Sequence, residues 1–98
     1  MIEHLGAEDF LPHVDKAFAV KNGRQALVLT RVEQPRLGDR GEGEFRASFL
    51  LIFRGPPGDV LPEGLYTFDV ENGPSFELYV MPIHTPARDR QDYQSSFN

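Results

Sequence analysis

Histidine and carboxylate side chains are the groups of this sequence that could bind a metal ion. Asp9 and His13 stand four residues apart, a spacing that places two ligands on one face of a helix. Pro12 interrupts the helix that this pair would need, and the sequence contains no His-x-x-x-His pair. The remaining histidines are His4 and His84. We therefore predict no metal and no other cofactor, and we expect these side chains to cap turns or to face solvent.

Catalytic nucleophiles and carboxylate pairs lack the arrangement that their chemistry requires. No serine lies in a Gly-x-Ser-x-Gly turn or beside a base, and cysteine is absent. Glu42 and Glu44 fall in a glycine-rich stretch that cannot hold two carboxylates at a fixed separation. No glycine-rich loop follows a strand and opens a helix, as a phosphate cradle requires. The sequence predicts a protein that is not an enzyme.

Length and charge narrow the range of partners. A chain of 98 residues is the size of one domain, so we expect a single β domain over residues 1–98. Ten basic and fifteen acidic residues give a net charge of −5, which disfavours a nucleic acid partner. No apolar run approaches the ~18 residues of a membrane helix, and the start lacks a signal-peptide profile. We expect no membrane insertion and synthesis in the cytoplasm, with incorporation into a larger particle left open.

The elements that must position these side chains begin with a helical segment, residues 1–14. Glu8 and Asp9 are typical of a helix N-terminus, and Pro12 limits the helix to a turn or two. The apolar side chains of this segment are Leu5, Phe10, Leu11 and Val14. Because they need burial, we predict that the segment forms a lid on the rest of the domain.

From residue 16 onward the apolar residues recur with the period of two that is typical of strands. Asn22–Gly23 is a hairpin signal between the first two runs. The six runs are residues 16–20, 24–33, 45–54, 65–71, 75–83 and 92–97. They predict a mainly β fold, a small antiparallel barrel or sandwich of about six strands with one short N-terminal helix.

Residues 34–44 interrupt this pattern with three glycines, one proline and five charged side chains. We expect a flexible surface loop, with Arg36 and Arg40 as the first sites of tryptic cleavage. The loop is either a long connection or a binding loop, since long loops on rigid sheets often carry function.

The third of the six runs is apolar on both faces, which predicts a central strand. Phe49, Leu51 and Phe53 share one face, so Leu50 and Ile52 on the other face cannot enter the same core. Either the N-terminal lid covers these two aliphatic side chains, which we favour, or a partner protein does. With the loop arginines, the candidate interaction residues are Leu50, Ile52, Arg36 and Arg40.

Residues 53–68 concentrate proline and glycine between two apolar stretches. These prolines could form a polyproline ligand or mark the turn between two strands. We expect Gly55 to adopt a backbone angle closed to other residues, and proline cannot donate to a strand ladder, so we favour the turn. The chain's tyrosines belong to alternating strands and are interpreted as scaffold unless they cluster: Tyr66, Tyr79 and Tyr93.

Several short motifs make the sequence similar to a known family. They are "DFLPHV" at 9–14, "FRGP" at 53–56, "LPEGLYTF" at 61–68, "ELYVMPI" at 77–83 and "YQSSFN" at 93–98. Over nearly the whole chain they resemble a family of small bacterial proteins catalogued as a domain of unknown function. The resemblance implies a glycine after the "PHV" element, where this chain has Asp15, and an association with phage-tail-like genes. It supplies no catalytic residues.

These observations favour a non-enzymatic structural or protein-interaction component of a larger assembly, phage-tail-like on the strength of the resemblance. Its partner would be another protein or further copies of the chain. The alternative is a stand-alone binding module that holds a small ligand or peptide between the 34–44 loop and the mouth of the barrel.

Overall fold

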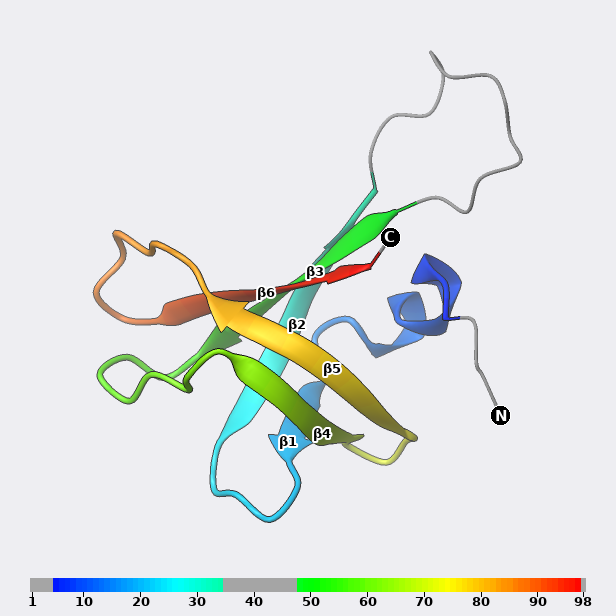
Figure 1. The fold of residues 1–98 in the computed structure, drawn as a ribbon, viewed down its shortest axis with the longest axis horizontal. Coiled ribbons are helices and arrows are strands. Elements are labelled where there is room, and N and C mark those ends of the chain that lie inside the picture. The colour runs from blue at the N-terminus through cyan, green and yellow to red at the C-terminus, as the bar shows by residue number, and fades with distance from the viewer. Residues whose placement is uncertain (1–4, 35–47, 98) are drawn as a thin grey trace.

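A computed structural model describes residues 5–34 and 48–97, and it contains six strands. They are β1 (Ala17–Val20), β2 (Ala26–Glu33), β3 (Phe49–Gly55), β4 (Gly64–Val70), β5 (Ser75–Pro82) and β6 (Gln91–Phe97). All neighbours pair antiparallel, and the strands close into a barrel in the order β1-β2-β3-β6-β5-β4 (Figure 1). The predicted mainly β class, antiparallel barrel and strand number are confirmed.

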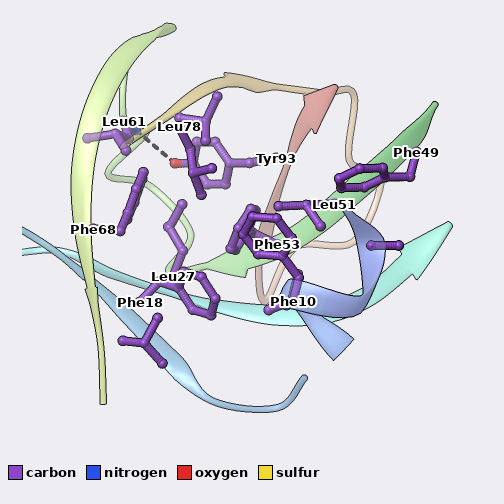
Figure 2. Close-up of a cluster of buried hydrophobic side chains, with 14 residues drawn as sticks. Phe10, Phe18, Leu27, Phe49, Leu51, Phe53, Leu61, Phe68, Leu78 and Tyr93 are labelled. Atoms are coloured by element: carbon purple, nitrogen blue, oxygen red, sulfur yellow. Dashed lines mark hydrogen bonds between the residues drawn. The ribbon is translucent and has the colours of Figure 1, made fainter. Parts of the chain in front are cut away.

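Side chains at every second position fill the interior of the barrel. On β3 these are Phe49, Leu51 and Phe53, and β3 lies between β2 and β6, as expected of a central strand. The rings of Phe18 and Phe53 pack edge to face with centroids 5.2 Å apart. Burying each such ring stabilises the fold by about 1.5–3 kcal/mol. The interior is therefore a packed core, drawn in Figure 2.

Of the two ladders that β6 forms, the ladder with β5 is much shorter than the ladder with β3. The β3–β6 ladder pairs seven residues with seven, whereas the β5–β6 ladder contains only Met81–Gln94 and Pro82–Tyr93. Phe10 fills the space that this leaves. Its ring centroid lies 4.6 Å from that of Phe76 on β5 and 5.5 Å from that of Phe97 on β6. An aromatic side chain from outside the barrel thus completes the β5–β6 seam.

Two short 3-10 turns, η1 (Ala7–Asp9) and η2 (Leu11–His13), carry Phe10 between them. The Asp9 carboxylate accepts a hydrogen bond from the Gly6 N–H at 2.8 Å, so it caps the first turn as expected. Pro12 lies inside the second turn, and the segment stays short for the predicted reason. In Figure 1 these turns lie beside the end of β6. The predicted short N-terminal helix is confirmed in this 3-10 form.

The lid covers a different face from the one that we predicted. Phe10 is fully buried and packs with Phe49, whose ring centroid is 6.0 Å away, so the segment joins the barrel interior. Leu50 and Ile52 belong to the outer face of β3. The prediction that the lid covers them is wrong, because Phe10 belongs to the core cluster, Leu5 and Val14 pack against that cluster, and Leu11 is exposed.

Left-handed backbone angles occur at the turns. Asn22 and Asn72 have φ of 64° and 56°, each before a glycine in the connection between two strands. Asp15 has φ of 75°, which is why a glycine suits the position after the "PHV" element. Gly55 was expected to have such an angle, and this is wrong: it belongs to β3 and the positive φ is at Gly58. Gly55 instead provides space for its neighbours in the core.

The predicted loop, residues 34–44, lies outside the described residues except for Gln34. Arg36 and Arg40 lie in that part of the chain, and so do the first three residues of the predicted third run, 45–47.

Candidate functional site

Tyr93 on β6 is fully buried, and its hydroxyl holds the segment that leads into β4. The Leu61 N–H donates a hydrogen bond to the Tyr93 hydroxyl oxygen at 2.7 Å, the dashed line in Figure 2. Burial raises the pKa of Tyr93, and the negative charge of Asp59 adds to this, against the opposing effect of the Leu61 N–H. The neutral phenol is therefore a fixed internal anchor for the chain at Leu61.

The next two residues are held by the other two tyrosines. The Tyr66 hydroxyl donates to the Pro62 carbonyl oxygen at 2.7 Å. The Tyr79 hydroxyl, from β5, donates to the Glu63 carboxylate. Three strands thus supply one tyrosine hydroxyl each to three successive residues, 61–63. The three hydroxyls share one target, the proline- and glycine-rich segment, although the Tyr93 ring is buried in the interior and the Tyr79 ring is exposed.

The same segment is tied to the β1–β2 connection two residues earlier. The Gln25 side-chain amide donates to the Asp59 carbonyl oxygen at 2.9 Å. Arg24 and Asp59 add an exposed ion pair at 3.8 Å, which contributes little. Because hydrogen bonds fix both ends of residues 59–63, this segment is a structured turn that leads into β4. It forms a rigid base for the neighbouring side chains of β4 and β5.

Beside this base, two large apolar side chains face the solvent. Leu65 on β4 and Tyr79 on β5 are direct cross-strand partners on the outer face, with 60% and 48% of their surface exposed. The hydrogen bond to Glu63 fixes the Tyr79 ring, and it raises the pKa of Tyr79 together with some loss of hydration and the carboxylate charge. We call Leu65, Tyr79, Glu63, Thr67 and Glu77 the Leu65–Tyr79 surface.

The geometry of this surface suits protein binding. A single exposed leucine is ordinary, but an adjacent leucine and tyrosine form a continuous apolar contact with a polar tip. Tyrosine is enriched among the residues that dominate interface energies. Because hydrogen bonds already order the Tyr79 ring, less side-chain entropy is lost when a partner covers it.

The predicted interaction residues on β3, Leu50 and Ile52, offer a partner much less exposed apolar surface than Leu65 and Tyr79 do. Ile52 is only 5% exposed and lies between Arg31 and Gln94 in the registers of β2 and β6. A β-bulge at Thr30 brings the threonine hydroxyl to the Ile52 carbonyl oxygen at 3.0 Å. Ile52 therefore offers little surface to a partner.

Leu50 is half-buried and borders a hollow of about 340 Å³ at the end of β2, β3 and β6. The stacked rings of Phe49 and Phe97, with centroids 4.6 Å apart, form its floor with Leu50. The polar lining is Glu33, Gln34, Ser48 and Ser96. The volume falls within the range of small-ligand sites, and the lining residues come from the end of β2, the start of β3 and the end of β6.

The family model described as "Domain of unknown function (DUF6916)" matches residues 5–97. The chain belongs to the DUF6916 family. The predicted resemblance to a domain of unknown function, over nearly the whole chain, is confirmed. No curated protein and no solved structure matches the chain.

The histidines and carboxylates that we considered as metal ligands are dispersed in this DUF6916 domain. Asp9 caps a turn, the His13 ring packs edge-on against Phe76 at 6.0 Å, and His84 is exposed. Within residues 5–34 and 48–97, His, Asp and Glu form no group of three that could hold a metal ion. The same residues include no helix long and apolar enough to cross a membrane.

A sequence signal for the Leu65–Tyr79 surface exists, and our prediction missed it. Alternation assigns Tyr66 and Phe68 to the interior of the DUF6916 barrel, which places Leu65 outside. In the same way Leu78 points inward and Tyr79 outward. Two large apolar residues out of phase with the buried set, on neighbouring strands, indicate an exposed contact that scaffold packing does not explain.

Proposed function

We propose that this DUF6916 domain is a non-enzymatic interaction module that binds a protein partner through the Leu65–Tyr79 surface, as a component of a larger assembly. The observation that carries the proposal is the exposed Leu65–Tyr79 pair, held on a base of three tyrosine hydrogen bonds. An apolar contact whose side chains are already ordered, on a closed barrel, suits a domain that is built into a larger assembly. A phage-tail-like particle is the assembly that the family resemblance suggests.

Size-exclusion chromatography with light scattering tests this function. The protein is run alone and with the products of neighbouring genes, and we expect a complex with one of them. Leu65→Ser should abolish co-elution without lowering the melting temperature, because the side chain is exposed in the free protein. Leu11→Ser is the matched control, since Leu11 is 50% exposed on the N-terminal turns. Co-elution that Leu65→Ser leaves intact would show that the surface is not the binding site.

A second function is favoured by the hollow at the barrel mouth. We propose, as the alternative, that Phe49, Leu50 and Phe97 receive the apolar part of a small ligand or peptide while Ser48 and Ser96 supply hydroxyl contacts. A screen of small aromatic fragments by NMR tests it. Shifts concentrated at Ser48, Leu50 and Ser96 would support this function, and a screen without such shifts would refute it.

A further inference from the structure

We propose that the partner of the Leu65–Tyr79 surface is a positively charged protein segment, in which lysine or arginine flanks an exposed apolar side chain. This inference rests on the proposed function and adds to it the chemistry of the partner. The charged residues around the apolar pair support it, and so do the positions of the ion pairs in the described residues.

The two strands that carry the surface contain one sign of charge, and one lysine adjoins them, since the Lys21 N–H donates to the Thr67 carbonyl oxygen at 2.8 Å. Residues 60–82, which include β4 and β5, contain four carboxylates and no lysine, arginine or histidine. The carboxylates are Glu63, Asp69, Glu71 and Glu77. Glu77 and Tyr79 share the outer face of β5, and Glu63 accepts the Tyr79 hydroxyl, so two of the four lie directly against the apolar pair.

No ion pair of the described residues neutralises these carboxylates. The three ion pairs found there join Arg24 to Asp59, Arg31 to Glu33 and Arg90 to Asp92, all outside residues 60–82. Glu63 and Glu77 are exposed, and charge acts over about 8–10 Å at physiological salt. A cation that docks beside Leu65 therefore gains an attraction that no ion pair within residues 5–34 and 48–97 has already satisfied.

The sign of the charge excludes other occupants. The anionic backbone of nucleic acid and the anionic lipids of a membrane surface would be repelled. A second copy that used the same surface would oppose acid to acid across a two-fold axis. The β2–β3 outer face lies on the other side of the barrel and offers Arg54, since Arg31 already hydrogen bonds to Glu33 at 2.5 Å. Among the described residues of that face, one arginine without an ion pair is a poor match for four carboxylates, so a separate basic protein fits best.

Titration of the isotope-labelled protein with three synthetic peptides tests the inference. The first peptide alternates lysine and leucine, the second lysine and serine, and the third glutamate and leucine. We expect the lysine–leucine peptide to shift amide signals of Leu65, Thr67, Glu77 and Tyr79. Binding should weaken as salt rises from low to physiological strength. The other two peptides, which lack either the apolar or the basic component, should bind at least about tenfold more weakly.

Two variants test the apolar and the charged component of the binding surface separately. Leu65→Ser should weaken binding of the lysine–leucine peptide about tenfold by removing apolar contact. Glu77→Gln should weaken it roughly two- to fourfold and reduce its salt dependence. The matched controls are Leu11→Ser and Glu8→Gln, which make the same changes on the N-terminal turns, and both should leave the affinity unchanged.

The outcomes separate this inference from the function on which it rests. If the glutamate–leucine peptide binds the Leu65–Tyr79 surface as well as the lysine–leucine peptide, the surface is an interaction site and the basic partner is wrong. If the lysine–leucine peptide shifts residues elsewhere, or does not bind, both are wrong. Equal binding of the lysine–serine peptide would show a diffuse electrostatic attraction and overturn the proposed contact. Self-association without peptide, lost in Leu65→Ser, would instead identify a second copy as the occupant.

Discussion

At the scale of the residue, environment gives the three tyrosines different roles. Tyr93 is an internal hydrogen-bond acceptor, Tyr66 a half-buried donor, and Tyr79 an exposed ring with an anchored hydroxyl. Each hydroxyl serves one residue of the segment that enters β4. A residue type that alternation alone assigns to scaffold therefore carries both the internal anchor and the exposed contact.

Tyr93→Phe should lower stability and change its dependence on alkaline pH. The variant leaves the buried Leu61 N–H without its acceptor, which costs about 1–3 kcal/mol. Burial raises the pKa of Tyr93 in the folded protein, so the stability tied to its neutral form is fully present below the ordinary tyrosine pKa of about 10. That stability is lost as pH rises through the higher folded value.

Urea unfolding between pH 7 and 11 measures both effects. The wild-type protein should lose stability more steeply above pH 10 than Tyr93→Phe does. Parallel curves for the two proteins would mean that the Tyr93 hydroxyl ionises as readily in the folded chain as in the unfolded chain. Tyr66→Phe is the control, because its hydroxyl bonds to an exposed carbonyl oxygen.

Asp15→Gly should leave stability unchanged or raise it by up to about 1 kcal/mol. Asp15 has φ of 75°, a strained angle for most residues and an ordinary one for glycine, while glycine adds entropy to the unfolded chain. The Asp15 N–H still donates to Leu29 at 2.7 Å in the variant. Lys16→Gly, next to it and without a positive φ, should lose about 0.5–1 kcal/mol. Thermal unfolding compares the two, and equal losses would contradict the argument from strain.

At the scale of the element, period-two alternation predicted the six strands because one face of each strand must be buried. It also predicted the central place of β3, whose two faces are both apolar. Alternation could not predict which neighbouring strands pair over only a few residues and leave part of the seam unfilled. The β5–β6 seam depends on the curvature of the closed barrel, so the sequence pattern of Phe10 indicates burial but not the face that receives it.

The candidate site shows the same division. Proline and glycine in residues 53–68 predicted a turn, but hydrogen bonds between residues 16 to 32 positions apart fix that turn, and no local pattern encodes them. Gly55 shows why type alone misleads. A Cβ there would lie 2.8 Å from a methyl carbon of Leu27, so close packing, and not the backbone angle, explains the glycine.

Phe10→Ala should be among the most damaging single changes to this fold. The ring is fully buried among Phe49, Phe76 and Phe97, and removing such a ring typically costs about 3–5 kcal/mol. Leu11→Ala is the matched control, since the neighbouring side chain is half exposed and should cost well under half as much. Denaturant unfolding with both variants measures the difference. Similar losses at the two positions would show that Phe10 does not complete the β5–β6 seam.

At the scale of the whole molecule, the barrel separates an apolar interior from an outer face on which charge is uneven. Within the described part of the chain, the carboxylates of β4, β5 and the connection between them form no ion pair, and the three ion pairs found there lie elsewhere. With a net charge of −5 at pH 7, copies of the chain repel one another, most strongly through this face. We therefore expect this charge to oppose self-association through the Leu65–Tyr79 pair.

Lowering the pH towards the sequence pI of about 5.0 should remove this protection. At the pI the net charge of the chain is zero, so the repulsion between copies is weakest and the exposed apolar pair becomes available to other copies. Light scattering should therefore report a monomer at pH 7 and concentration-dependent association near pH 5. Leu65→Ser should reduce that association. Leu11→Ser should reduce it less, because Leu11 lies outside the strands and has no cross-strand partner such as Tyr79. Association at pH 7 as strong as at pH 5 would show that charge does not keep the copies apart. A Leu65→Ser variant that associates like the wild-type protein would show that another surface is the adhesive one.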